Sequence, residues 1–225
     1  MNSDVPRHVA IIMDGNARWA ERNGVSSIAG NREGAENLKR TVRIASELGV
    51  EQITVFAFST ENWDRPAGEV KGLMRLFAEK LEIEAPELDA DGVRLRFVGE
   101  RDRIDPNLLS KMEWAERLTA RHTERTLFVA FNYGGRAEIL RAAERYSGGG
   151  EAEFRKLLYM PDMEDPDLII RTSGELRISN FLLWQAAYSE LYFSDKLWPD
   201  FDRAEFERAL SDYARRQRRY GAREQ

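Results

Sequence analysis

The chain has 225 residues, with 34 Lys and Arg against 39 Asp and Glu, no cysteine, and two histidines, His8 and His122. These counts exclude a thiolate nucleophile, a disulfide, an iron–sulfur cluster and any cysteine-based or local histidine-pair metal site. The net charge of −5 argues against nucleic-acid binding, which requires a basic surface. No apolar run is long enough for a membrane-spanning helix or a signal segment, so we expect a cytoplasmic protein. Both histidines are expected to be structural or surface residues.

Short β-rich runs alternate with longer helical patterns along the chain. The predicted strands are His8–Met13, Ile53–Phe58, Val93–Val98, Leu127–Asn132, Leu168–Arg171 and Leu191–Phe193. The predicted helices are Gly34–Leu48, Glu69–Ala85, Pro106–Thr119, Arg136–Tyr146, Glu153–Leu158 and Arg203–Arg219. This alternation predicts the α/β class: a single domain over residues 1–225 with a mostly parallel central sheet of about six strands, flanked by helices.

Four predicted strands are followed by small polar residues together with an arginine. The segments begin at Asp14, Ser59, Asn132 and Arg171 and read DGNARW, STENWDRP, NYGGR and RTSGELRISN. In a parallel sheet these ends lie on one edge, where ligands bind, so we expect them to form an anion site. The excess of arginine, 28 against 6 lysines, has two explanations: codon bias, or a set of guanidinium groups that bind phosphates.

Several known phosphate-binding signatures are absent from the chain. It contains no GxxxxGK[ST] and no GxGxxG after the first strand, and Asp14 is not followed by a second aspartate two residues later. What is left is one carboxylate at a strand end, beside Asn16 and Arg18. A carboxylate that faces diphosphate oxygens needs a cation between them, and Mg²⁺ suits such a site.

The motifs at these strand ends resemble those of the cis-prenyltransferases, the undecaprenyl diphosphate synthase family. The resemblance covers nearly the whole chain. It rests on HVAIIMDGNARWA from His8, FSTENWDRP from Phe58, NYGGR from Asn132, DLIIRTSGELRISNFLLW from Asp167, SELYF from Ser189 and WPDF from Trp198, with RYG from Arg219 near the end. The DDxxD signature of the unrelated trans-prenyltransferases is absent.

The resemblance implies an enzyme that adds isopentenyl diphosphate to an allylic diphosphate such as farnesyl diphosphate, forming cis double bonds and a medium-chain polyprenyl diphosphate. It implies that Asp14 and Asn62 are catalytic and that Asp14 and Glu190 hold Mg²⁺. An amide is a very weak base, so positioning is the more credible role for Asn62. The substrate-binding residues that it implies are Gly15, Asn16, Ala17, Arg18, Trp19, Ser59, Thr60, Glu61, Trp63, Arg65, Arg171, Arg177, Ile178 and Ser179.

Two positions depart from the family pattern. Ser27 and Asn31 stand where the family usually has arginine and histidine, both of which contact phosphate. Both are carried over as substrate-binding positions, but a lost charge-assisted hydrogen bond costs about 1.5–3 kcal/mol, or roughly ten- to hundredfold in affinity. Two alternatives are open. Arg32 or Lys39 supplies the missing phosphate contact, or the protein prefers a different substrate.

Further expectations concern the product, the partners and the alternatives. The apolar residues at helical spacing in Glu69–Ala85 form either ordinary core or the wall of a hydrophobic tunnel for the growing chain. The resemblance implies a homodimer in which Arg219 and Gly221 reach the partner's isopentenyl site, and transient membrane contact through the lipid product. One alternative is a non-catalytic partner subunit of a heteromeric prenyltransferase, and another is a short-chain cis-prenyl diphosphate synthase. A phosphate-ester hydrolase would lack a recognisable nucleophile.

Overall fold

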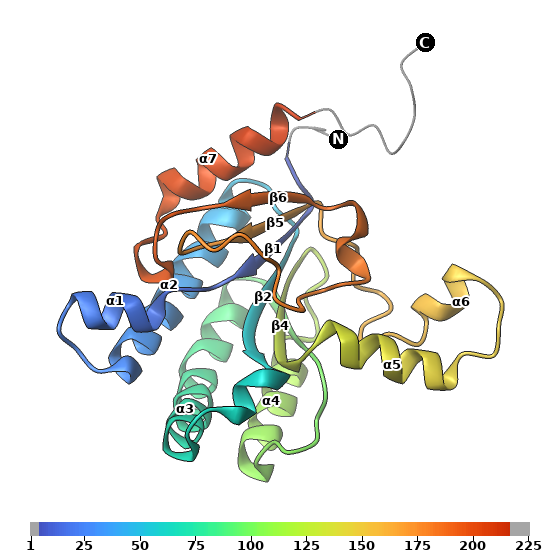
Figure 1. Ribbon diagram of the computed structural model, residues 1–225, viewed down its shortest axis with the longest axis horizontal. Coiled ribbons are helices and arrows are strands. Elements are labelled where there is room, and N and C mark those ends of the chain that lie inside the picture. The colour runs from blue at the N-terminus through green and yellow to red at the C-terminus, as the bar shows by residue number, and fades with distance from the viewer. Residues whose placement is uncertain (1–4, 217–225) are drawn as a thin grey trace.

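The computed structural model describes residues 5–216, and they form one six-stranded parallel sheet with helices packed against it (Figure 1). The strand order is β3-β4-β2-β1-β5-β6. The strands are β1 (His8–Ile12), β2 (Gln52–Ser59), β3 (Val93–Val98), β4 (Arg125–Tyr133), β5 (Leu168–Arg171) and β6 (Glu190–Phe193). All five pairings between neighbouring strands are parallel. The predicted α/β class with a parallel sheet of six strands is therefore confirmed.

Seven α-helices and three short 3₁₀ helices connect the strands within the described residues. The α-helices are α1 (Asn16–Arg22), α2 (Ser27–Glu47), α3 (Ala67–Ala90), α4 (Pro106–Thr119), α5 (Gly135–Arg145), α6 (Glu151–Arg155) and α7 (Arg203–Ala214). The 3₁₀ helices are η1 (Thr60–Asp64), η2 (Gln185–Tyr188) and η3 (Trp198–Asp200). No helix in the described part of the chain is both long and apolar enough to cross a membrane.

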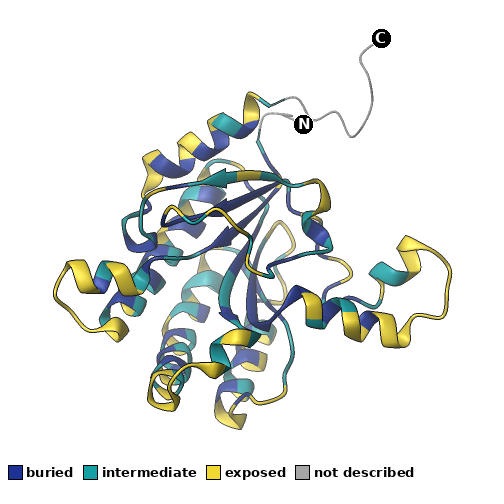
Figure 2. Ribbon diagram, viewed as in Figure 1, coloured by how far each residue is buried: buried dark blue, intermediate teal, exposed yellow. Residues whose placement is uncertain are grey.

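Successive residues of each strand pack into different cores, as the two-residue period of a strand requires. Val9 and Ile11 of β1 belong to a large cluster with residues of α2, α3, α4 and α7, whereas Ala10 and Ile12 belong to a smaller cluster on the opposite face. The second cluster is completed mainly by Tyr133 and by residues of the segments 159–163 and 178–186. Figure 2 shows the buried strands between these layers. The sheet is therefore covered on both faces, as its apolar strands require.

The helix predictions were least accurate near the first strand. The helix predicted to begin at Gly34 begins at Ser27, where Ser26 caps it by accepting a hydrogen bond from the Ala29 N–H at 3.3 Å. The segment after Asp14, where no helix was predicted, forms the short helix α1. The last helix ends at Ala214 instead of Arg219. The first two errors share a cause, because these turns lack a regular apolar stripe and are set by caps and close packing.

Candidate functional site

Residues from three strand ends surround one cavity of about 490 Å³ at the carboxyl edge of the sheet. Its lining includes Met13 and Asp14 after β1, Ala57 to Ser59 of β2, Glu61, Asn62 and Arg65 from the segment after β2, and Arg171, Ser179 and Asn180 from β5 and the loop that follows it. The fourth strand end contacts this group through Asn180, as described below. The predicted convergence of the strand ends on one edge is therefore observed.

Asp14 and Arg171 form the central ion pair of the cavity. The register places Arg171 opposite Ile12, two residues before Asp14. The Nη2 of Arg171 donates to Oδ2 of Asp14 at 2.8 Å, and its Nη1 donates to Oγ of Ser179 and to the carbonyl of Arg177, both at 2.6 Å. The Arg171 side chain is only 5% exposed and that of Asp14 is 31% exposed. A buried guanidinium thus fixes a carboxylate that is itself partly exposed.

Thr172 and Ser173 hold the loop of Asp14 and Arg18 against the end of β5. The Asp14 N–H donates to Oγ1 of Thr172 at 2.9 Å, and that hydroxyl lies 2.7 Å from the Asp14 carbonyl. Arg18 donates to the carbonyl and the hydroxyl of Ser173 at 3.1 and 2.6 Å. Its Nη2 also lies 3.8 Å from Oδ1 of Asp14. Thr172 and Ser173 were missed by the sequence analysis, because short hydroxyl side chains carry no charge signal.

Glycines allow α1 to approach its neighbours closely. Gly15 has a φ of 109°, a conformation that favours glycine. A Cβ on Gly34 of α2 would lie 2.5 Å from Oδ1 of Asn16, so a larger residue there would displace the Asn16 side chain. The Asn16 Oδ1 is buried and accepts no hydrogen bond from the described residues. Ala17 is exposed, and Trp19 donates from its Nε1 to Asp200 at 2.9 Å. The second half of the motif therefore faces partly away from Asp14.

The segment after β2 is ordered by its own side chains. Asn62 Oδ1 accepts the backbone N–H of Ser59 at 3.0 Å, and the Ser59 side chain accepts the N–H of Asn62, which together form a capping box. Trp63 donates from Nε1 to Oδ1 of Asn132 at 2.7 Å. Arg65 pairs with Glu69 at 3.0 Å and keeps its exposed side chain at the rim. These contacts fix the second motif relative to the end of β4.

Asn180 joins three of the strand-end loops, and the sequence analysis did not single it out. Its Nδ2 donates to Glu61 at 2.8 Å, its Oδ1 accepts the N–H of Arg136 at 2.8 Å, and its carbonyl accepts the N–H of Gly135 at 2.8 Å. Burial alone would raise the pKa of Glu61, but hydrogen bonds, including the one from Asn180, lower it. Thr60 lies against Gly134 at this junction.

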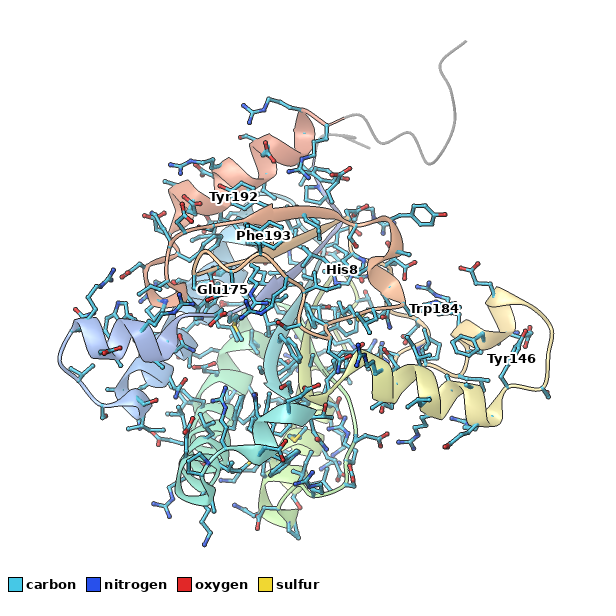
Figure 3. The ribbon with its side chains drawn as sticks, in the orientation of Figure 1. His8, Tyr146, Glu175, Trp184, Tyr192 and Phe193 are labelled. Carbon is cyan, nitrogen blue, oxygen red and sulfur yellow. The ribbon has the colours of Figure 1, made fainter. Side chains whose placement is uncertain are left out.

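The remaining predicted residues are spread more widely. Arg177 is exposed and pairs with Glu175, which Figure 3 labels on the loop that follows β5, while Ile178 packs into the smaller core cluster. Ser27 is exposed in the first turn of α2, and Asn31, one turn later, lines a second cavity described below. Arg219 and Gly221 lie outside the described residues, so their predicted roles stay predictions.

Glu190 is not brought to Asp14 within one chain. It pairs in register with Leu168 at the start of β6, while Leu168 pairs with Val9, five residues before Asp14. At about 3.3 Å per residue the backbones of the two residues are separated by roughly 16 Å along the strands. Glu190 instead accepts a hydrogen bond from Arg216 at 2.7 Å. Among the described residues no cluster of three or more His, Cys, Asp or Glu side chains could hold a metal ion.

A second, apolar cavity of about 130 Å³ adjoins the first. It lies between α2, α3 and the sheet, and most of its lining is aliphatic or aromatic, including Leu38, Leu73, Phe77, Leu81 and Val129. Met13 and Ala57 line both cavities. A polar pocket with a buried arginine therefore shares a wall with a hydrocarbon-lined one, an arrangement that suits an amphiphile with an anionic head and an apolar tail.

Comparisons with known proteins agree with this arrangement. The sequence profile of the family described as "Putative undecaprenyl diphosphate synthase" matches residues 12–221. An isoprenyl transferase of Thermotoga maritima is 50% identical, with 96% of this chain and 97% of the relative covered. A ditrans,polycis-undecaprenyl-diphosphate synthase of Pseudomonas aeruginosa, named as specific for (2E,6E)-farnesyl diphosphate, is 49% identical, with 96% of this chain and 91% of the relative covered.

Solved structures give the same result. The structure of lavandulyl diphosphate synthase from Lavandula x intermedia, in complex with dimethylallyl diphosphate, has a TM-score of 0.94 at 34% identity and covers 98% of this chain and all of that chain. A probable undecaprenyl diphosphate synthase of Campylobacter jejuni has a TM-score of 0.83 at 31% identity, with the same coverage. The fold is thus that of a prenyl diphosphate synthase. The chain belongs to the undecaprenyl diphosphate synthase family of cis-prenyltransferases, and it is an isoprenyl transferase.

Proposed function

We propose that the protein condenses isopentenyl diphosphate onto an allylic diphosphate, such as farnesyl diphosphate, and makes a medium-chain polyprenyl diphosphate with cis double bonds. The observation that carries this proposal is the shared wall of the two cavities at Met13 and Ala57. A diphosphate bound near Arg171 would place its hydrocarbon tail against that wall. The apolar cavity along α3 would then act as the tunnel for the growing chain.

The chemistry requires diphosphate to leave as a carbon–carbon bond forms. The C1–O bond of the allylic substrate breaks, the double bond of isopentenyl diphosphate attacks C1, and a proton passes from C2 of the isopentenyl unit to the departing diphosphate. Negative charge develops on the leaving group, so its stabilisation by fixed cations is the main catalytic task. Arg171 and Arg65 line the cavity and Arg18 lies beside Asp14, so these three can supply that charge.

The residues fit a magnesium ion that is shared with the substrate. Asp14 uses Oδ2 to bind Arg171, while its Oδ1 lies 3.8 Å from Nη2 of Arg18. Mg²⁺ is commonly bound by one or two carboxylates together with substrate phosphates and water, so one accessible carboxylate oxygen is a sufficient protein ligand. In this proposal Asp14 holds the ion, which would neutralise the diphosphate charge. Glu190 is too far away to join it within one chain.

Asn62 is assigned a positioning role in this proposal. Its amide oxygen accepts the Ser59 N–H, and an amide is a very weak base. Its Nδ2 can donate a hydrogen bond but cannot accept a proton. Ser59, Thr60, Glu61 and Trp63 would shape the same side of the pocket.

The proposed assembly is a homodimer, cytoplasmic, with transient contact between the membrane surface and the lipid product. Exposed apolar side chains near the edge strand β6 support the dimer: Leu176 is 76% exposed, Tyr188 73% and Leu191 37%. An edge strand with exposed apolar neighbours favours association with a second chain. The measured mass of the protein in solution tests this, and a monomer at working concentrations would contradict it.

The experiment that tests the function is incubation of the purified protein with Mg²⁺, isopentenyl diphosphate and allylic starters of several lengths. We expect a polyprenyl diphosphate, and none when the divalent ion is chelated. Turnover close to normal in an Asp14→Ala variant would contradict the role given to Asp14. A protein that is inactive alone but stimulates a second prenyltransferase chain would favour the partner-subunit alternative.

A further inference from the structure

Two charged residues interrupt the inward face of α3. Leu73, Phe77, Leu81 and Leu88 of that helix line the apolar cavity, and Lys80 and Glu84 line it with them. Lys80 is only 9% exposed. Lysine and glutamate rarely lie so deep in a protein unless they are paired. Their position on the cavity wall calls for an explanation beyond the core packing that the apolar stripe provides.

The two residues belong to an ionic seam that joins α3 to α2. Lys80 Nζ donates to the carboxylate of Glu36 on α2 and lies 3.5 Å from Oε1 of Glu84. Arg32 and Glu79 form a further pair across the same helices, at 2.5 Å. Unlike Lys80 and Glu84, Arg32 and Glu79 do not line the cavity. The seam therefore contains charged groups on the cavity wall, Lys80 and Glu84, and others outside it, such as Arg32 and Glu79.

The depth of the pair along the cavity follows from the geometry of α3. The helix begins directly after the motif that borders the polar cavity, so Leu73 lies nearer the diphosphate pocket than Leu88. With a rise of 1.5 Å per residue, Lys80 lies roughly 10 Å and Glu84 roughly 16 Å beyond Leu73. A tail that lengthens from the polar pocket would pass apolar side chains first and meet the charged pair afterwards.

A hydrocarbon chain would be less stable beside Lys80 and Glu84 than in the part of the cavity nearer the diphosphate pocket. Oε1 of Glu84 is buried and accepts no hydrogen bond from the described residues. Burial raises the pKa of the Glu84 carboxyl, although Lys80 acts in the opposite direction. An apolar chain at this level would exclude water from both charged groups and give them no hydrogen bond in return, which is unfavourable. The cavity thus favours hydrocarbon near the diphosphate pocket and disfavours it at the level of Lys80 and Glu84.

We propose that Lys80 and Glu84 are specificity-determining residues, which limit product length by placing a charged pair on the wall of the tunnel. The inference rests on the proposed function, since it concerns where the growing chain stops. The proposed cause of the length limit is the charge of the two side chains. A purely steric limit would depend on side-chain volume alone.

The test is the product distribution of a double variant, Lys80→Met with Glu84→Met, which keeps side chains of similar length and removes the charges. We expect its products to be longer than those of the unsubstituted protein by at least one five-carbon unit. A matched control, Arg32→Met with Glu79→Met, removes an ion pair from the same seam outside the cavity and is expected to keep the original length. Lys80→Arg, which preserves the charge, is also expected to keep it.

Unchanged product length in an active double variant would overturn the inference, and so would an equal lengthening in the Arg32 and Glu79 control. If the double variant fails to fold by circular dichroism, Glu84→Gln is measured instead, with longer product expected and unchanged length overturning the inference. Absence of product from the unsubstituted protein with every starter would overturn the proposed function itself. The two failures are therefore distinguishable.

Discussion

Arg171 is directed onto Asp14 by two further hydrogen bonds, and the 2.8 Å contact between the two side chains links the ends of neighbouring strands β1 and β5. Ser179 and the carbonyl of Arg177 accept the other guanidinium nitrogen, so the group has little freedom to turn away. A substrate diphosphate or a metal ion at Asp14 would therefore meet an arginine that is already oriented. Such preorganisation is what electrostatic catalysis requires.

Arg171→Lys tests this orientation. Lysine keeps the charge but loses the planar fork, and it cannot bind Asp14, Ser179 and the Arg177 carbonyl together. At about 1.5–3 kcal/mol for a charge-assisted bond, we expect kcat/KM to fall roughly ten- to hundredfold. The measurement is steady-state kinetics with circular dichroism to verify folding, and Arg145→Lys on the exposed surface of α5 is the control. A kcat/KM within twofold of normal would remove Arg171 from the site.

Ser27→Arg tests the departure from the family pattern. Ser27 is exposed one turn before Asn31, which lines the apolar cavity. An arginine there would supply the phosphate contact that the family usually has, so KM for the allylic substrate should fall by about tenfold. The control is Thr123→Arg, which adds the same charge at an exposed position. Thr123 lies just before the start of β4, at the edge of the sheet opposite the site. An unchanged or higher KM would argue against phosphate contact at this position.

Gly34→Ala tests the close approach of α1 and α2. The new methyl group would lie 2.5 Å from the buried Oδ1 of Asn16, so the Asn16 side chain must move. We expect a loss of about 1–3 kcal/mol in the free energy of unfolding together with a higher KM. Gly72→Ala in α3 is a matched control, since its Cβ would meet only Ile28 at 3.8 Å. Equal unfolding midpoints in urea for the two variants would contradict the account.

His8 makes the stability of the fold dependent on pH. Burial lowers the pKa of His8 to about 4, from 6.5 in the unfolded chain, and its two ring nitrogens lie 2.7 Å from the Glu164 carbonyl and from Oγ1 of Thr54. Because the unfolded chain takes up the proton first, stability is fully present above pH 6.5 and is lost as the pH falls toward 4. The loss attributable to His8 is about 3 kcal/mol.

Urea unfolding at pH 7 and pH 4 measures this effect. A His8→Gln variant is expected to be less stable at pH 7 but to lose less stability than the unsubstituted protein between the two values. Equal losses in both proteins would show that other groups dominate the acid dependence.

The sequence predicted the sheet well for a physical reason. Strands buried on both faces must be apolar along their whole length, and runs such as His8–Ile12 and Leu168–Arg171 stand out for that reason. The polar residues that follow the strands were then placed on one edge by topology alone. The order of elements along the chain was thus enough to predict that Asp14, Asn62 and Arg171 lie close together, and they line one cavity.

Features that depend on register and packing could not be predicted in this way. The distance between Asp14 and Glu190 is set by the pairing of β5 with β6, which no local pattern encodes. Asn180 joins three loops through hydrogen bonds that depend on their final positions. Lys80 and Glu84 form a charged pair at i and i+4, a spacing that is common on exposed helices, and only the structure shows that it faces a cavity.

The measurement that tests the central claim most directly is the double-bond geometry and length of the product formed from farnesyl diphosphate, isotopically labelled isopentenyl diphosphate and Mg²⁺. The account predicts a medium-chain polyprenyl diphosphate in which every added unit carries a cis double bond, resolved by chromatography and nuclear magnetic resonance. Products with only trans units, or no elongation of any allylic starter, would contradict it.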